Sequence, residues 1–145
     1  MARIKIDLPE AFIYTCNYNV RIADINYGGH LGNDAVLTIM QEGRLQFLNY
    51  LGYENELGID GDVGMIVTDS AIVYKSESFY GDHIEIKIAV EDYNKYGFDM
   101  IYVLTNKASG KEIARGKTGI VFMHYSTRKL AATPTKFLEK LQDTQ

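Results

Sequence analysis

Residues 34–51 read DAVLTIMQEGRLQFLNYL, and this stretch carries the long helical pattern of the chain. The apolar and small residues that recur at steps of three and four are Val36, Leu37, Ile39, Met40, Gly43, Phe47, Leu48 and Leu51. Asn33 is a favourable N-cap and Gly52 a favourable stop, so a helix is predicted between them. Because the run AVLTIM is apolar nearly all round, we expect this helix to be deeply buried. A mid-helix glycine costs about 1 kcal/mol relative to alanine, and close approach of a strand at Gly43 is the expected reason.

Outside this helix the hydrophobic period is mostly two. Alternating apolar residues predict strands at about 12–22, 65–75, 84–91, 96–104 and 113–125. The connectors at 92–95 and 106–110 are short and polar, which is typical of antiparallel hairpins. A second, short helix is expected after Pro134, with Thr133 or Thr135 as its cap. The order of elements favours an α+β domain, in which a long helix packs against a five-stranded, mostly antiparallel sheet.

Length and composition predict a single domain over residues 1–145. Hydrophobic residues make up 46% and charged residues 23% of the chain, as in ordinary globular proteins. A net charge of −4 disfavours broad nucleic-acid binding, which needs a basic face. Since no signal peptide and no apolar run of roughly 18 residues is visible, we expect a cytoplasmic protein without a membrane segment.

The single cysteine, Cys16, excludes an intramolecular disulfide and a metal site made of cysteines alone. Its position in the apolar phase of the first predicted strand indicates packing and not a nucleophile. The three histidines share no metal-ligand spacing, so no metal is expected.

The chemistry is concentrated between the first strand and the helix, where residues 21–33 read RIADINYGGHLGN. Within ten residues this segment holds the carboxylate of Asp24, the carboxamide of Asn26, the imidazole of His30 and three glycines. Glycines let a backbone approach a ligand closely, and the helix that follows presents free N–H groups and a positive dipole end. Such a terminus can hold an oxyanion. The alternative is a plain turn, in which Asn33 caps the helix and Asp24 bonds the loop.

Residues 24–33, DINYGGHLGN, resemble the pattern Asp-x-Asp-x-x-Gly-His-Val-Asn-Asn of hotdog-fold thioesterases of the 4-hydroxybenzoyl-CoA thioesterase-like branch. The helix segment 41–48, QEGRLQFL, is similar to that family's Glu-Glu-Ala-Arg-Thr-Glu-Phe-Leu. Residues 80–82, Tyr-Gly-Asp, are similar to its Tyr-Gly-Asp-x-Leu. The likeness extends over residues 11–125.

This resemblance implies a hotdog fold, in which the sheet wraps the central helix and the chains form homodimers, with a dimer of dimers as the further expected assembly. The substrate would be an acyl thioester of coenzyme A, or less often of acyl carrier protein, hydrolysed to a carboxylic acid and a free thiol. The site would lie at the subunit interface, where the substrate-binding positions are Gly29, Leu31, Gly32 and Asn33. No metal and no cofactor are implied, because coenzyme A enters as part of the substrate.

One position departs from the family pattern, because Asn26 stands where the family has its catalytic aspartate. A carboxamide is not a base, although it orients water or a carbonyl through hydrogen bonds. Three explanations are open. Asp24 supplies the carboxylate instead, or Glu42 supplies it from the helix as in a second branch of hotdog thioesterases, or the protein binds acyl thioesters without hydrolysing them well. The resemblance gives His30 the role of bonding the substrate carbonyl or holding the carboxylate.

Overall fold

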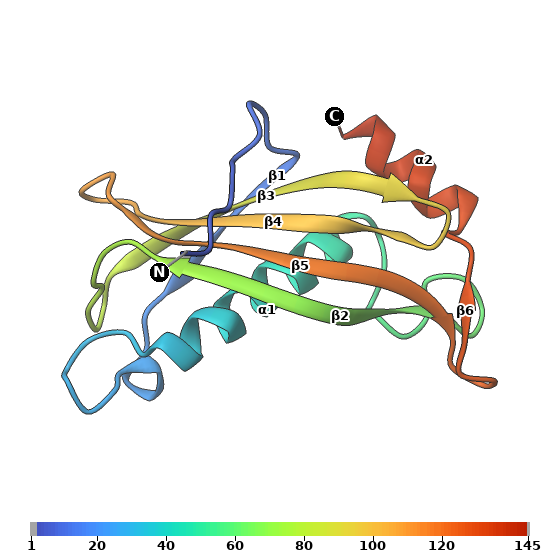
Figure 1. Ribbon diagram of the computed structural model, residues 1–145. Coiled ribbons are helices and arrows are strands. Elements are labelled where there is room, and N and C mark those ends of the chain that lie inside the picture. The colour runs from blue at the N-terminus through green and yellow to red at the C-terminus, as the bar shows by residue number, and fades with distance from the viewer. Residues whose placement is uncertain (1–2, 145) are drawn as a thin grey trace.

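The computed structural model describes residues 3–144 of the chain. Its elements, in chain order, are β1 (Tyr14–Asn19), the 3-10 turn η1 (Ile22–Asp24), α1 (Asn33–Tyr50), β2 (Val63–Tyr74), β3 (His83–Asn94), β4 (Gly97–Asn106), β5 (Glu112–His124), β6 (Lys129–Ala131) and α2 (Thr135–Asp143). Every strand pair is antiparallel, and the sheet order is β1-β3-β4-β5-β2, with β6 added to β5. Figure 1 shows the long strands of this sheet in front of α1.

The predicted α+β arrangement is confirmed, with one short strand more than expected. β5 pairs with β4 up to Val121 and with β6 from Phe122 onward. A strand of three residues is too short to display a period of two, so β6 left no signal in the sequence. Both predicted hairpins are present, since β3–β4 and β4–β5 pair directly.

α1 is held very close to the sheet at Gly43. A Cβ atom at this position would lie 2.9 Å from Cγ2 of Ile86 in β3, closer than real Cβ contacts. The expected approach of a strand at this glycine is therefore confirmed. The same closeness appears from the other side, because a Cβ atom on Gly116 of β5 would lie 2.5 Å from the sulfur of Met40. The two glycines thus set the distance between helix and sheet.

The ends of the two helices differ from the prediction. Gly32, and not Asn33, occupies the N-cap position of α1, while Gly52 follows the helix with φ +98°, as its expected role as a stop requires. α2 is present, but Pro134 is its N-cap, so the predicted caps Thr133 and Thr135 are wrong. Proline with an extended backbone enters a helix without needing its missing N–H group.

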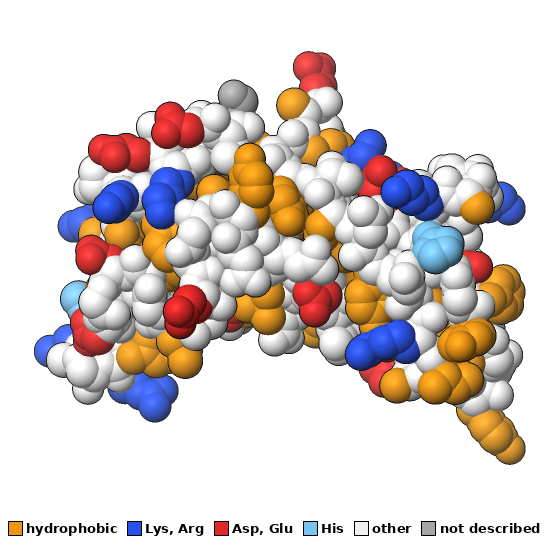
Figure 2. Space-filling view, turned by 180° about the vertical axis from the view of Figure 1, so that it is seen from behind, with side chains coloured by type: hydrophobic (Ala, Val, Ile, Leu, Met, Phe, Trp, Pro, Cys, Tyr) orange, Lys and Arg blue, Asp and Glu red, His pale blue; other side chains and the backbone are white. Residues whose placement is uncertain are grey.

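The deep burial expected of α1 is confirmed for one face only. One face packs in the core through Val36, Ile39, Met40, Phe47 and Leu48, all almost inaccessible to solvent. The opposite face is open: Leu37 is 40% and Tyr50 63% exposed. Figure 2, seen from behind the sheet, shows hydrophobic side chains reaching the surface on this side. The single chain therefore leaves part of an apolar helix uncovered.

The other face of the sheet is partly covered by the chain's own N-terminal segment. Ile6 is buried there against Ala89 and Ile101, and Arg115 donates a hydrogen bond of 2.8 Å to the carbonyl oxygen of Ile6. In Figure 1 this segment crosses in front of the strands, whereas α1 lies behind them. Within residues 3–144, no helix has the length and apolar character that crossing a membrane requires.

A buried ionic network joins α1 to the sheet. The guanidinium of Arg44 donates from Nε to Glu56 at 2.6 Å and from Nη1 to the hydroxyl of Tyr102 at 2.9 Å. Thr118 of β5 completes the network at 2.9 Å from the same hydroxyl. Burial raises the pKa of Tyr102, so its hydroxyl stays neutral. Within residues 3–144, no side-chain atom of this network is among the buried nitrogens and oxygens that lack a hydrogen-bond partner, which is the condition for keeping a charge in a core.

Replacing Arg44 by alanine should lower the free energy of unfolding by about 3–5 kcal/mol, because Glu56 and Tyr102 would lose their charged partner in a buried setting. Denaturant titration of wild type and variant measures the difference. The matched control is Arg3→Ala in the exposed N-terminal segment, for which we expect a change within about 0.5 kcal/mol. Equal stability of the two variants would contradict this role of the network.

Candidate active site

Residues 25–32, here named the site loop, form a tight turn between η1 and α1. Its backbone closes through the pairing of Ile25 with Leu31 and a bond of 2.9 Å from Asn26 N–H to the carbonyl of His30. The side-chain oxygen of Asn26 accepts a hydrogen bond of 2.9 Å from Gly28 N–H. Gly29 has φ +82°, a conformation that glycine adopts without strain. The segment NYGG thus folds this way because each turn position carries a suitable residue.

The imidazole of His30 packs over this turn. A Cβ atom on Gly28 would lie 3.1 Å from Nε2 of His30, so the missing side chain makes room for the ring. The other ring nitrogen, Nδ1, lies 3.3 Å from the carbonyl oxygen of Leu31. The ring is 34% exposed, with Nε2 3.9 Å from the carboxylate of Glu77.

Residues 75–82, here named the β2–β3 turn, lie beside the site loop. Leu31 N–H donates a hydrogen bond of 2.7 Å to the carbonyl of Ser78, which joins the two segments. The turn is fixed by Asp82, whose Oδ2 accepts from the hydroxyl of Ser78 at 2.9 Å and from Phe79 N–H at 2.9 Å. Gly81 has φ +85°. The Tyr-Gly-Asp sequence at 80–82 is therefore the element that sets the position of this turn.

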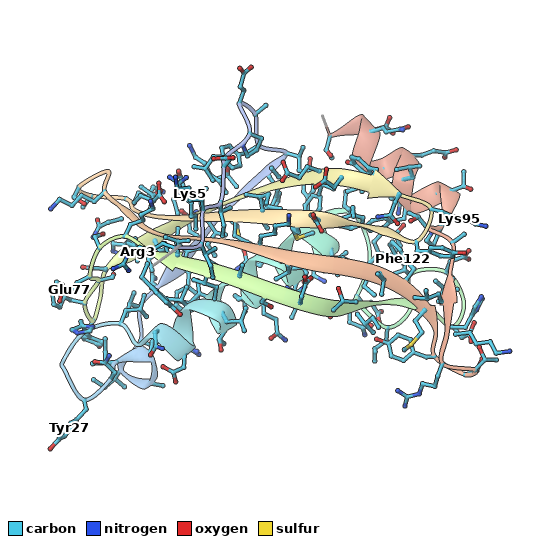
Figure 3. All side chains as sticks on the ribbon, in the orientation of Figure 1. Arg3, Lys5, Tyr27, Glu77, Lys95 and Phe122 are labelled. Atoms are coloured by element: carbon cyan, nitrogen blue, oxygen red, sulfur yellow. The ribbon has the colours of Figure 1, made fainter. Side chains whose placement is uncertain are left out.

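A cavity of about 390 Å³ lies between the site loop, the start of α1 and the β2–β3 turn. The residues that line it are Asn26, His30, Leu31, Asn33, Val36, Tyr74, Lys75, Ser76, Glu77 and Ile113. Ligand sites combine apolar walls with a few polar groups in this way. Figure 3 shows Glu77 at the end of the molecule where α1 begins, and Tyr27 at the tip of the site loop, pointing away from the body.

The N-terminus of α1 opens at this cavity. Its first N–H groups, at Asn33 and Asp34, precede the first intrahelical bonds and have no acceptor within the helix. The N-cap Gly32 makes no side-chain cap bond, and the carboxylate of Asp34 occupies the space where a Cβ atom of Gly32 would lie. The hydroxyl of Tyr74 donates to the carbonyl of Asn33 at 3.1 Å. Together with the helix dipole, these amides favour a partial negative charge at the cavity.

Of the residues proposed from the sequence as catalytic, the structure brings Asn26 and His30 together in the cavity. Asp24 lies elsewhere and is buried, with 6% exposed surface. It accepts hydrogen bonds from the hydroxyl of Tyr18 at 2.6 Å and from Arg21 N–H at 2.8 Å. Its contacts fix the start of the site loop, and it is absent from the lining of the cavity.

Glu42 also lies outside the cavity of this chain. It is on the exposed face of α1, where its carboxylate accepts a hydrogen bond of 3.1 Å from Gln46. Nine residues beyond Asn33, it stands roughly 13 Å further along the helix axis. The nearby thiol of Cys16 is buried, as its place in the pattern predicts, and burial together with the charge of Glu42 raises the pKa of this thiol to about 11.

Of the four predicted substrate-binding positions, two line the cavity and two do not. Leu31 and Asn33 line the cavity, whereas Gly29 shapes the turn and Gly32 leads into the helix.

Sequence reasoning missed Glu77, which lines the cavity from the β2–β3 turn. The sequence feature that could have pointed to Glu77 is its position three residues before Tyr80, which begins the Tyr-Gly-Asp sequence. Within residues 3–144 no group of three His, Cys, Asp or Glu side chains is arranged to hold a metal ion.

Comparison with known proteins gives one family and many similar folds. The model of the thioesterase-like superfamily matches residues 20–141. The solved structure of Slr0204, a 1,4-dihydroxy-2-naphthoyl-CoA thioesterase from Synechocystis, is similar with TM-score 0.82 and 20% identity over 90% of this chain and 96% of that chain. The structure of BH1999 gentisyl-coenzyme A thioesterase is similar with TM-score 0.78 and 18% identity, over 88% of this chain and 99% of that chain. The structure of the 12:0-ACP thioesterase from Umbellularia californica is similar with TM-score 0.74 and 17% identity, over 90% of this chain and 50% of that chain. No curated protein sequence matches. At these identities the likeness to the solved structures is one of fold.

Replacing Asp24 by alanine should lower the free energy of unfolding by about 1–3 kcal/mol, because the hydroxyl of Tyr18 and the amide of Arg21 would lose a common charged acceptor in a buried position. Thermal or denaturant unfolding measures this difference. Asp143→Ala, at the exposed end of α2, is the matched control and should change the stability by less than about 0.5 kcal/mol. An Asp24 variant as stable as this control would show that the contacts of Asp24 do not hold the loop.

Proposed function

The chain belongs to the thioesterase-like superfamily, and on that premise we propose that it is an acyl-CoA thioesterase whose reaction takes place in the cavity beside His30. The match to the family model and the similar solved structures confirm the family and the hotdog fold that residues 24–33 and 41–48 predict. The observation that carries the assignment of the site is the meeting of Asn26, His30 and the N-terminus of α1 in one cavity. The reaction converts an acyl thioester and water to a carboxylic acid and a thiol, with coenzyme A as part of the substrate and no separate cofactor.

In the proposed complex the thioester carbonyl points its oxygen at the start of α1. The amides of Asn33 and Asp34 then donate to the negative charge that develops on this oxygen as the carbonyl carbon becomes tetrahedral. Because these donors belong to a helix fixed in the core, they need no reorganisation during the reaction. Val36, Leu31 and Ile113 supply apolar walls for the part of the substrate next to the carbonyl.

Asn26 contributes a donor at the position of the family's acid. Its side-chain oxygen is already engaged by Gly28 N–H, so the group left for the substrate is its NH₂. We assign this NH₂ to the thioester carbonyl or to the attacking water. A carboxamide cannot take the proton of that water, so the base is a different residue.

We propose that the active assembly is a homodimer formed along β2, with a dimer of dimers as a further step. β2 has 12 residues and pairs on one side with β5, while no strand of residues 3–144 covers its other edge. Such a long edge is open to another chain. Val67 in this strand is 39% and Leu37 in α1 40% exposed, which supplies apolar surface on both elements. The end of β2 carries Tyr74, which lines the cavity, so this partner would lie next to the site.

Thiol release from a panel of short, long and aromatic acyl-CoA substrates, followed with a thiol-reactive dye, tests the activity. We expect release well above the uncatalysed rate from at least one member. Asn26→Ala should lower kcat by roughly tenfold or more, because an oxyanion or water contact is lost. Glu42→Gln, the matched substitution outside the cavity, should leave kcat within about threefold.

A 100-fold loss of kcat in Glu42→Gln would show that the catalytic carboxylate is Glu42 of α1, and would contradict this arrangement. A panel without release, combined with saturable binding of an acyl-CoA, would identify a binding protein that lacks the reaction. Thiol release from acyl carrier protein substrates alone would show that the substrate is a thioester of that carrier and not of coenzyme A.

Sedimentation equilibrium should give a mass of twice 16.4 kDa or a multiple of it. Val67→Lys should shift the protein toward the monomer, because a charge on the exposed edge would be buried against a second copy. Thr127→Lys, on the exposed β5–β6 turn, is the matched control and should keep the mass of the wild type. A wild type that sediments as a monomer at all concentrations would exclude the proposed dimer.

A further inference from the structure

The cavity contains a carboxylate that does not occupy the position of the family's aspartate. Among the residues that line it, Glu77 is the acid, and Asn26 stands where the family pattern has aspartate. Asp24 and Glu42 are engaged elsewhere, with Tyr18 and Gln46. Within the cavity of the single chain, the groups that can take the proton from water are therefore Glu77 and the imidazole beside it.

Glu77 is held next to His30 by the backbone. Leu31, the residue after His30, donates to the carbonyl of Ser78, the residue after Glu77, at 2.7 Å. Asp82 anchors the same turn through Ser78 and Phe79. Since both segments are fixed at adjacent residues, the fold holds the backbones of His30 and Glu77 close together, and from this position the exposed side chain of Glu77 reaches toward the imidazole.

The hydrogen bonding of His30 sets which of its nitrogens is a base. Nδ1 lies 3.3 Å from the carbonyl oxygen of Leu31, and because a carbonyl only accepts, the tautomer that makes this hydrogen bond carries its proton on Nδ1. Nε2 then carries a lone pair and lies toward Glu77, with 3.9 Å to Oε1. This distance exceeds that of a direct hydrogen bond. One water oxygen, however, fits at about 2.8 Å from both atoms and can donate one proton to each.

We propose that His30 and Glu77 together bind and activate the hydrolytic water, with Nε2 of His30 as the general base and the Glu77 carboxylate as the second acceptor. This inference rests on the proposed thioesterase function and names the residues that replace the family's aspartate. Both are catalytic residues in this scheme, because both contact the attacking water. The 66% exposure of Glu77 in the single chain leaves water free access to this position.

The reaction step balances without a further reactant. The water oxygen forms a bond to the thioester carbonyl carbon while its proton passes to Nε2, and the carbonyl electron pair moves onto the oxygen held by the amides of α1. The imidazolium that forms lies beside the negative charge of Glu77, which stabilises it. When the carbonyl is restored, the carbon–sulfur bond breaks with its electron pair on sulfur. The imidazolium then gives its proton to the thiolate, so that acid and thiol leave and His30 is neutral again.

Steady-state kinetics with the acyl-CoA that wild type cleaves fastest tests this pair. We expect Glu77→Gln to lower kcat by about 100-fold with KM within threefold, because the amide cannot balance the imidazolium. Glu77→Asp keeps the charge but withdraws it by one methylene, so its kcat should lie between those of wild type and Glu77→Gln. His30→Asn should lose at least as much as Glu77→Gln, and the double variant His30→Asn/Glu77→Gln should be no slower than His30→Asn, since the two residues act on one water.

Glu139→Gln, the same change on an exposed helix position remote from the cavity, is the control and should keep the kcat of wild type. Circular dichroism and thermal unfolding confirm that each variant is folded, which is expected for substitutions at an exposed side chain such as Glu77. Three results overturn the proposal while leaving the thioesterase function intact: unchanged kcat in Glu77→Gln, a change in KM alone, or strictly multiplicative losses in the double variant. A wild type that cleaves no acyl thioester overturns the proposed function, and this inference with it.

Discussion

The closeness of α1 to the sheet is the constraint on which the rest of the structure depends. At Gly43 the helix backbone meets the side chain of Ile86, and at Gly116 the sheet backbone meets Met40, so a side chain at either glycine would push helix and sheet apart. At the residue after Gly43, the guanidinium of Arg44 donates to Glu56 and to Tyr102. Packing thus sets the separation of helix and sheet, while the hydrogen bonds fix the helix against sliding or rotation. The position of the helix N-terminus, and hence of the amides at the cavity, is set by contacts that lie well inside the core.

The site itself consists of two turns, each closed by one of its own side chains. Asn26 accepts from Gly28 in the site loop, and Asp82 accepts from Ser78 and Phe79 in the β2–β3 turn. An Asx-type turn needs an acceptor oxygen, which asparagine and aspartate both possess. Asparagine at position 26 therefore preserves the geometry of the loop while it removes a negative charge. This explains how a chain can depart from its family at the reacting position and still keep the family's backbone there.

Local patterns in the sequence were sufficient to predict the helices, the hairpins and the site loop, but not the burial of α1 or the neighbours of His30 in the fold. The helix at 33–50, both hairpins and the site loop follow from periodicity, capping and turn residues. The same patterns overestimated the burial of α1, because apolar residues around a helix do not reveal that Leu37 stays 40% exposed in the folded chain. They also directed attention to Asp24 and Glu42, which are near His30 in sequence or match a known spacing. Glu77 follows His30 by 47 positions, and the backbone hydrogen bond from Leu31 to Ser78 that joins their segments is a feature of the fold, which local sequence patterns do not report.

The two faces of the sheet have different consequences for assembly and for the chemistry. The N-terminal segment covers part of the outer face through Ile6, whereas Leu37 and Tyr50 of α1 and Val67 and Tyr74 of β2 remain exposed. The end of β2 leads directly into Lys75 and Glu77 at the cavity. A second copy paired along this edge would displace bulk solvent around Glu77 and His30, apart from the hydrolytic water bound between them. Because charge–charge and charge–dipole interactions strengthen when solvent is excluded, the imidazolium would then be stabilised by Glu77, and the oxyanion by the helix amides, more strongly than in the isolated chain. The proposed dimer and the proposed His30–Glu77 pair therefore support each other physically, since one supplies the low-dielectric setting in which the other is most effective.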